Sequence, residues 1–158
     1  MAYVPGTSTA ITITAGSLGP GVARSSAAIT SGVVNNTTGI YVTVSALTTA
    51  VAATGNKQIV VYAYMSEDGT NYLGNSGTTD DVNGTDKTLT ALGSPTGLYY
   101  IGTIPLNQGA FAVTVREVFE LTRVLGGVPR KWGIVLFNDA GTALGATVTA
   151  TYSEPYYT

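Results

Sequence analysis

The nine residues from Arg130 to Asn138 constrain the fold of this chain more than any other stretch. They hold the only tryptophan and an almost unbroken apolar series, and turn-forming residues stand on both sides. The run is too short for a core helix, and an apolar series bounded by turns is typical of a strand buried on both faces. Pro129 precedes it, where a strand accepts proline without losing a ladder hydrogen bond. The sequence therefore predicts a central strand with which other segments pair.

Most other segments have the pattern of partners for this strand. Only 10% of the residues are charged, glutamate, lysine and glutamine are scarce, and 20 residues are glycine, which favours strands and turns over helices. The further predicted strands are Thr7–Thr14, Ala27–Val34, Ile40–Val44, Gln58–Ser66, Leu98–Ile104, Phe111–Arg116 and Ala146–Tyr152. Mixed or turn-rich segments between them are Gly16–Gly21, Leu47–Asn56 and Val118–Leu125. About eight strands without amphipathic helices predict an all-β, antiparallel β-sandwich or barrel.

The last of these strands has the cleanest alternation in the chain. Its expected inward residues are Ala146, Val148, Ala150 and Tyr152, and its expected outward residues are Thr147, Thr149 and Thr151. One apolar and one hydroxyl-bearing face indicate an antiparallel strand with a solvated side.

We expect one sandwich domain over residues 1–158, in which 1–20 can form an extended arm and 153–158 a tail. Up to Asn56 the only charged side chain is Arg24, which suggests threonine- and serine-bearing outer faces partly covered by neighbouring subunits. The net charge of −2 provides no basic field for nucleic acid or acidic lipid. No stretch reaches the ~18 apolar residues of a membrane span, and residues 1–5 do not resemble a secretory signal. We therefore expect a soluble protein made in the cytoplasm.

The residue inventory argues against an enzyme. The chain has no cysteine and no histidine, and it has no glycine-rich phosphate-binding motif. A carboxylate pair for glycoside hydrolysis could be drawn from Glu117, Glu120, Glu67 or Asp68. Glu117 and Glu120, however, are three residues apart, which in a strand places them on opposite faces. We predict no catalytic residues and no cofactor.

The long polar connection from Glu67 to Lys87 leaves two interpretations open. Glu67–Asn71 and Asp80–Asp86 gather the oxygen ligands that calcium prefers, although the spacing is not that of an EF-hand. The same residue types are ordinary turn formers. We favour turn chemistry and predict no metal site, and binding of calcium or of a host glycan by this connection stays an open alternative.

Three of the ten tyrosines, Tyr152, Tyr156 and Tyr157, cluster near the end of the chain. A terminal Pro-Tyr-Tyr has little chain around it to bury it, so contact with another subunit and a frayed tail are both open interpretations. Exposed aromatic residues can also stack on sugar rings or anchor a protein interface.

Several short motifs, taken in order, resemble a group of small tailed-bacteriophage structural proteins. They are Ser17–Arg24, Asp68–Tyr72, Leu98–Thr103, Pro129–Val135 and Gly141–Leu144. The resemblance is to capsid decoration, or cement, proteins with β-sandwich and often jelly-roll folds. It implies a non-enzymatic component of the virion, located on the capsid surface and made in the host cytoplasm. Its implied partner is the major capsid protein, and its implied form is a homotrimer.

The candidate contacts with the capsid or with other subunits are Tyr3, Arg24, Tyr152, Tyr156 and Tyr157. Two alternatives stay open, a tail or baseplate component and a carbohydrate-binding sandwich module.

Overall fold

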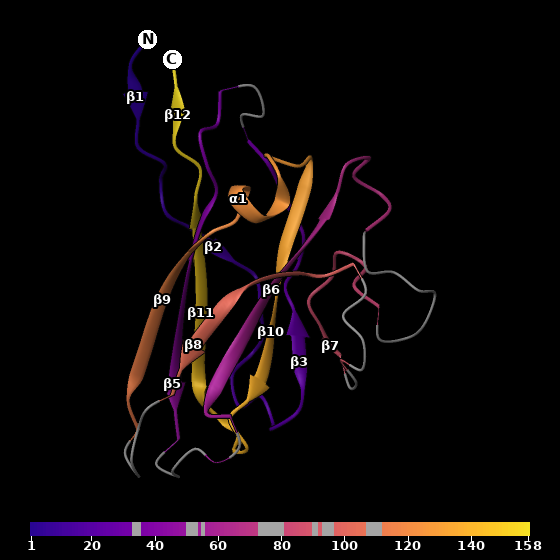
Figure 1. Ribbon diagram of the computed structural model, residues 1–158, viewed down its shortest axis with the longest axis vertical. Helices are drawn as coiled ribbons and strands as arrows, with labels where there is room; N and C mark the ends of the chain where they lie inside the picture. Colours follow the sequence, from indigo (N-terminus) through magenta and orange to yellow (C-terminus); the bar gives the residue numbers. More distant parts are fainter. Residues whose placement is uncertain are drawn as a thin grey trace.

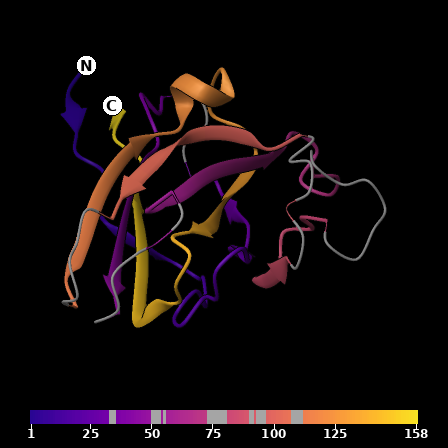
Figure 2. The same cartoon turned by 60° about the horizontal axis from the view of Figure 1, so that its bottom comes forward.

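The computed structural model describes residues 1–32, 36–49, 54, 56–72, 81–89, 92, 97–106 and 112–158. Within these ranges the chain forms twelve strands and one short helix, and every strand pair is antiparallel. The two larger sheets pack against each other, so the protein is an all-β antiparallel sandwich, as predicted (Figures 1 and 2). Twelve strands exceed the expected eight because six of them span only two or three residues.

The first large sheet has six strands in the order β7-β3-β10-β6-β8, with β4 also paired to β10. Its strands are β3 (Ala23–Ser25), β4 (Ile29–Thr30), β6 (Gln58–Ser66), β7 (Lys87–Leu89), β8 (Tyr99–Pro105) and β10 (Lys131–Asp139). The tryptophan strand is β10, which lies in the middle of this order and is buried from Trp132 to Leu136. The prediction of a central strand buried on both faces is confirmed.

The second large sheet has four strands in the order β2-β11-β5-β9. Its strands are β2 (Thr9–Ile11), β5 (Tyr41–Thr48), β9 (Thr114–Glu120) and β11 (Leu144–Ser153). The remaining elements are α1 (Thr122–Leu125), which follows β9, and a separate pair made by β1 (Tyr3–Val4) and β12 (Tyr156–Tyr157). Within the described residues, no helix has the length and apolar character that crossing a membrane requires.

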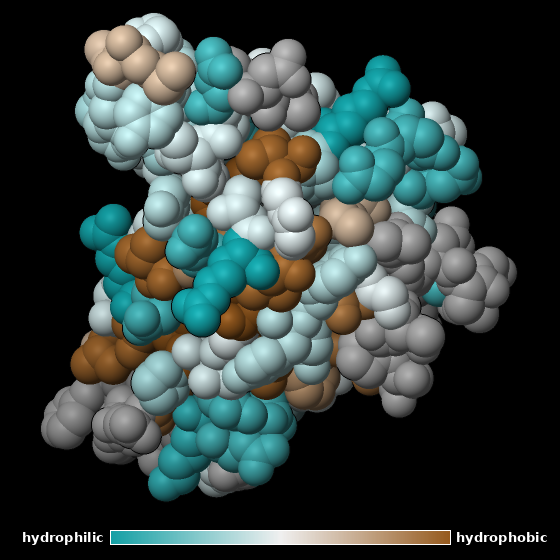
Figure 3. Space-filling model, turned by 45° about the horizontal axis from the view of Figure 1, so that its top comes forward, coloured by the Kyte–Doolittle hydropathy of each residue, from teal (hydrophilic) through white to brown (hydrophobic). Residues whose placement is uncertain are grey.

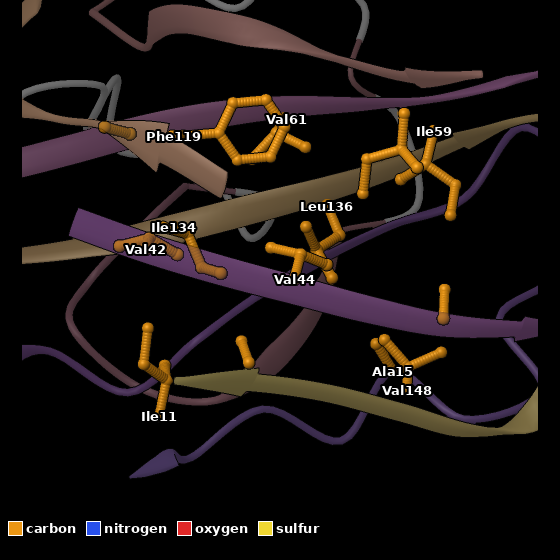
Figure 4. Close-up of a cluster of buried hydrophobic side chains, with 14 of the residues drawn as sticks. Ile11, Ala15, Val42, Val44, Ile59, Val61, Phe119, Ile134, Leu136 and Val148 are labelled. Carbon is orange, nitrogen blue, oxygen red and sulfur yellow. The ribbon is translucent and has the colours of Figure 1, made fainter. Parts of the chain in front are cut away.

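The main core lies between the two large sheets. Figure 4 shows Val42 and Val44 of β5 directed toward Ile134 and Leu136 of β10. These side chains are fully buried. Burial of such alternating apolar positions supplies the main driving force for closing a sandwich.

A second apolar cluster covers the outer face of the six-stranded sheet. Its buried members are Ala23, Tyr64, Val82, Leu89 and Val135. Val82 comes from the later part of the long polar connection and Leu89 from β7 at its end, so the chain itself folds back over β6 and β10. No neighbouring subunit is needed to explain why these strands are apolar on both faces.

Several predicted boundaries were wrong. The strand expected over Thr7–Thr14 is limited to β2, and the one expected over Ala27–Val34 is limited to β4, with residues 33 and 34 outside the described ranges. The strand expected over Phe111–Arg116 runs from Thr114 to Glu120, and residue 111 is not described. Ala146 was expected to face inward but is exposed, because the pairing of β11 with β5 shifts register between Leu144 and Val148. Thr147 and Thr149 are exposed as predicted.

Candidate functional site

The two ends of the chain form a small sheet of their own, which we call the terminal sheet. Tyr3 of β1 faces Tyr157 of β12, and Val4 faces Tyr156. Beyond them, the backbone N–H groups of Ala2 and Thr158 each donate to the carbonyl oxygen of the other residue, both at 2.9 Å. Figure 1 shows both termini side by side beyond one end of the sandwich. The tail therefore lies in a hydrogen-bonded strand.

A third segment supports the terminal sheet. The N–H of Thr38 donates to the carbonyl of Pro155 at 2.8 Å, and the N–H of Tyr157 donates to the carbonyl of Asn36 at 3.1 Å. Thr37 also forms an isolated bridge with Tyr156. An isolated two-stranded pair is marginally stable in water, so these extra bonds help to hold β12 in place.

The terminal sheet presents aromatic side chains without charged neighbours in its own sequence. Tyr3 is 56% exposed and Tyr157 is 41% exposed. Their rings meet edge to face, with centroids 5.7 Å apart and an interplanar angle of 66°. Residues 1–8 and 155–158 contain no charged side chain. Paired, partly exposed tyrosines combine apolar area with a polar tip, as anchor residues of protein interfaces do.

Tyr152 lies apart from this surface. It is half-buried on β11, where its ring packs edge-on against Trp132 with centroids 5.2 Å apart. Burial, together with the nearby Glu154, raises the pKa of its hydroxyl. The arrangement makes Tyr152 a packing residue between the core and the terminal sheet.

Arg24 also lies elsewhere, on β3 of the six-stranded sheet. Its Nε donates to Oδ1 of Asp86 at 2.6 Å, and its Nη1 donates to Thr88 Oγ1 at 2.7 Å. Burial alone would raise the pKa of Asp86, but hydrogen bonds from Arg24 and Thr14 outweigh burial and hold the pKa below its ordinary value. The structure therefore brings Tyr3, Tyr156 and Tyr157 together and uses Arg24 in an internal ion pair.

The start of the polar connection is an ordered turn around Asp68. Its Oδ1 accepts hydrogen bonds from the backbone N–H groups of Thr70 and Asn71 at 2.8 and 2.7 Å, and from Ser66 Oγ at 2.9 Å. These hydrogen bonds lower the pKa of Asp68. The described residues contain no group of three or more acidic side chains placed to hold a metal ion, and Asp80 is outside the described ranges. The bonds around Asp68 are those of turn chemistry.

The outer face of the four-stranded sheet is the second exposed surface, and we call it the hydroxyl face. A shallow depression of about 230 Å³ is lined there by Thr43, Ser45, Arg116, Thr149 and Thr151. The pairing registers place Thr149, Ser45 and Arg116 side by side across three strands. Arg116 has no hydrogen bond or ion pair with any described residue. The alternating threonines of β11 pointed to this face, but the position of Arg116 on it depends on strand pairing that the sequence does not reveal.

Glu117 and Glu120 both lie on β9, and their odd spacing places them on opposite faces of the sheet. No protein-family model matches the chain, and no curated protein is similar to it at a significant level. The fold defines the protein as an antiparallel β-sandwich with two open surfaces, the terminal sheet and the hydroxyl face. Any more particular assignment depends on the residues of these surfaces.

Proposed function

We propose that this protein is a non-enzymatic structural component of a tailed-bacteriophage virion. The most specific form of the proposal is a capsid decoration, or cement, protein that binds the assembled shell of the major capsid protein. The observation that carries it is the terminal sheet, in which both ends of the chain present exposed tyrosines beyond the sandwich. An aromatic surface without charged side chains suits contact with another protein better than contact with nucleic acid.

We also propose that the sandwich is a jelly roll. Support comes from eight strands that pair as a long hairpin would after rolling up. In chain order, the first pairs with the last, the second with the seventh, the third with the sixth and the fourth with the fifth, giving β2–β11, β3–β10, β5–β9 and β6–β8. These pairs fall alternately in the two sheets. Jelly rolls occur in viral capsid and lectin domains, so the topology suits the proposal without assigning the function.

The mechanism of a cement protein follows from linkage. A protein that binds only the assembled shell adds its binding free energy to the stability of that shell. Many copies on a symmetric lattice act together, so that a weak single contact suffices. Tyr3 and Tyr157 would supply apolar area that becomes buried on the capsid, and the protein would be located on the virion surface after synthesis in the host cytoplasm.

A sedimentation assay tests the proposal. Purified protein is mixed with undecorated capsids of the phage that encodes it, and the capsids are pelleted. We expect the wild type to pellet with the capsids and to raise the temperature at which they release DNA. Wild-type protein that stays in the supernatant at saturating concentration would contradict the proposal.

A matched pair of variants tests the surface. Tyr3→Ala combined with Tyr157→Ala should weaken pelleting at least tenfold, a loss that corresponds to about 1.4 kcal/mol. Tyr100→Ala on β8 is the control, because Tyr100 is 56% exposed, the same as Tyr3. Equal loss in both variants, or in neither, would show that the terminal sheet is not the contact.

The depression on the hydroxyl face favours a second candidate, a carbohydrate-binding module. Hydroxyl groups around a guanidinium that has no partner among the described residues can hydrogen-bond to sugars. A glycan array with the wild type and Arg116→Gln tests this, and binding that depends on Arg116 would support it. A tail or baseplate location is distinguished from the capsid by cryo-electron microscopy of the virion.

A further inference from the structure

The strand β9 is the edge strand of the four-stranded sheet. Among the described residues no strand is hydrogen-bonded to its outer side, which we call the open edge, although β8 of the six-stranded sheet lies close to β9. The strand β9 pairs only with β5 among the described strands, and the register runs without a shift from Thr114 to Glu120. Two hydrogen bonds fix the direction of its backbone groups. The N–H of Leu121 donates to Ile40 at 2.8 Å, and the carbonyl of Val113 accepts from Thr48 at 2.9 Å. Because backbone groups alternate along a strand, the odd-numbered residues face β5 and the even-numbered residues face the open edge.

The same even-numbered residues direct their side chains to the hydroxyl face. They are Thr114, Arg116, Val118 and Glu120, all exposed. Val118 is 56% exposed. Figure 3 shows several apolar patches on one face of the molecule, with polar side chains between them. Arg116 has no partner among the described residues, and Glu120 accepts only a 3.4 Å hydrogen bond from Thr122. Four residues apart in a strand, about 13 Å, Arg116 and Glu120 cannot pair with each other.

On β9 a cation (Arg116), an apolar residue (Val118) and an anion (Glu120) follow one another at alternate positions. This order is complementary to itself when the strand pairs with a second copy in the antiparallel direction. With Val118 opposite Val118 of a second copy, Arg116 lies opposite Glu120 of that copy, and Glu120 lies opposite its Arg116. The residues in these positions are also the ones whose N–H and C=O groups face the open edge. Side-chain charge and backbone direction therefore select the same register.

We propose that β9 pairs with β9 of a second copy of this chain about a two-fold axis at Val118. A two-fold interface requires one patch to be complementary to itself, and this strand meets the requirement. The pairing would join the two four-stranded sheets into one continuous sheet with an ion pair on each side of an apolar contact. Edge strands are usually blunted by charged side chains, proline, a bulge or a short length. Over its seven residues β9 has only the charged side chains, and Arg116 and Glu120 among them are the ones that a second copy would pair.

This contact predicts a dimer, whereas the resemblance to cement proteins implies a trimer. The mass of the isolated protein in solution distinguishes a dimer from a trimer. The measurement needs no capsid, so its failure and a failure of the proposed function are separate results.

Analytical ultracentrifugation of the purified full chain tests the pairing. We expect the wild type to dimerise reversibly. Arg116→Glu or Glu120→Arg alone places two pairs of like charges in the interface, and each should raise the dissociation constant of the dimer at least about tenfold. The double variant Arg116→Glu with Glu120→Arg reverses both charges and should restore dimerisation. Glu67→Lys, at an exposed position directly after β6 of the other large sheet, is the control for the charge change and should have no effect.

A proline variant separates pairing from folding. The N–H of Val118 faces the open edge, so Val118→Pro removes an intermolecular donor and no bond to β5. We expect a folded monomer, with the far-ultraviolet circular dichroism spectrum of the wild type. A wild type that stays monomeric or forms a trimer would overturn the proposal. A dimer that survives Val118→Pro, or a double variant that does not regain dimerisation, would overturn it too.

Discussion

Substituting Gly133 with alanine should destabilise the sandwich more than any other addition of one methyl group to β10. Gly133 faces Tyr64 across the β10–β6 pair. A Cβ atom at position 133 would overlap the ring carbon and hydroxyl oxygen at the tip of Tyr64. Tyr64 is fully buried, and its hydroxyl donates to the carbonyl of Ser26 at 2.7 Å. The glycine is required here for space between two central strands.

The loss of folding free energy in Gly133→Ala depends on whether the Tyr64 ring stays in place or moves. If the ring stays, overpacking costs about 1–3 kcal/mol. If the ring moves, its hydrogen bond is lost and the Ser26 carbonyl is left unsatisfied, which costs about 1–3 kcal/mol in addition. We therefore expect the free energy of unfolding to fall by about 2–5 kcal/mol, a large share of the roughly 5–15 kcal/mol of a typical domain.

Urea denaturation measures this loss. The only tryptophan, Trp132, is adjacent and fully buried, so its fluorescence reports unfolding directly. Gly19→Ala is the control, because a Cβ there meets only Val22 at an ordinary 3.7 Å, and its effect should be within about 0.5 kcal/mol. In a Tyr64→Leu background, Gly133→Ala should cost much less than in the wild type. A cost below about 1 kcal/mol in the wild type, or the same cost in both backgrounds, would refute the reasoning.

Two further predictions concern pH. The pKa of Asp86 is lowered in the folded protein, so its contribution to stability is present above the ordinary carboxyl pKa, about 3.9, and is lost as pH falls through the lowered value. Urea midpoints measured from pH 7 down should therefore converge for wild type and Asp86→Asn as the pH falls below the ordinary carboxyl pKa, and a constant difference would contradict this. Burial raises the pKa of Tyr64, so its contribution is present below the ordinary tyrosine pKa, about 10, and is lost as pH rises toward the raised value. Ultraviolet titration of the wild type should show one tyrosine that ionises only when the protein unfolds. The Tyr64→Phe variant should lack that step. Ionisation of all tyrosines while the fold persists would contradict the prediction.

The central strand and the last strand could be predicted because each is long and has a pattern with a physical cause. Trp132 to Leu136 are apolar without interruption because both faces of β10 are covered. Val148 and Ala150 alternate with threonines because only one face of β11 is buried. In both cases the local pattern records the burial that the strand experiences.

The short strands could not be predicted, because two or three residues carry no periodic signal. β3 contains Arg24 and Ser25 and exists because β10 and β7 pair on either side of it. The terminal sheet joins positions 3 and 157, and nothing near either tyrosine indicates the other. The candidate contacts were chosen from residue type and position in the chain, which could not show that Tyr3 pairs with Tyr157 or that Arg24 is held by Asp86.

The two large sheets differ in a way that bears on where partners bind. Over β3, β10 and β6 the outer face of the six-stranded sheet is covered by Val82, Leu89 and their neighbours, so the chain itself occupies most of that side, and Tyr100 on β8 stays 56% exposed. The outward residues of the four-stranded sheet stay exposed or half-buried, and they include Arg116 and Val118 at its open edge. Since a surface already covered by its own chain offers little area for association, contacts with other proteins are expected on the four-stranded side and at the terminal sheet. The threonine-rich outer faces suggested by the sequence thus have a place in the structure, but on one sheet only.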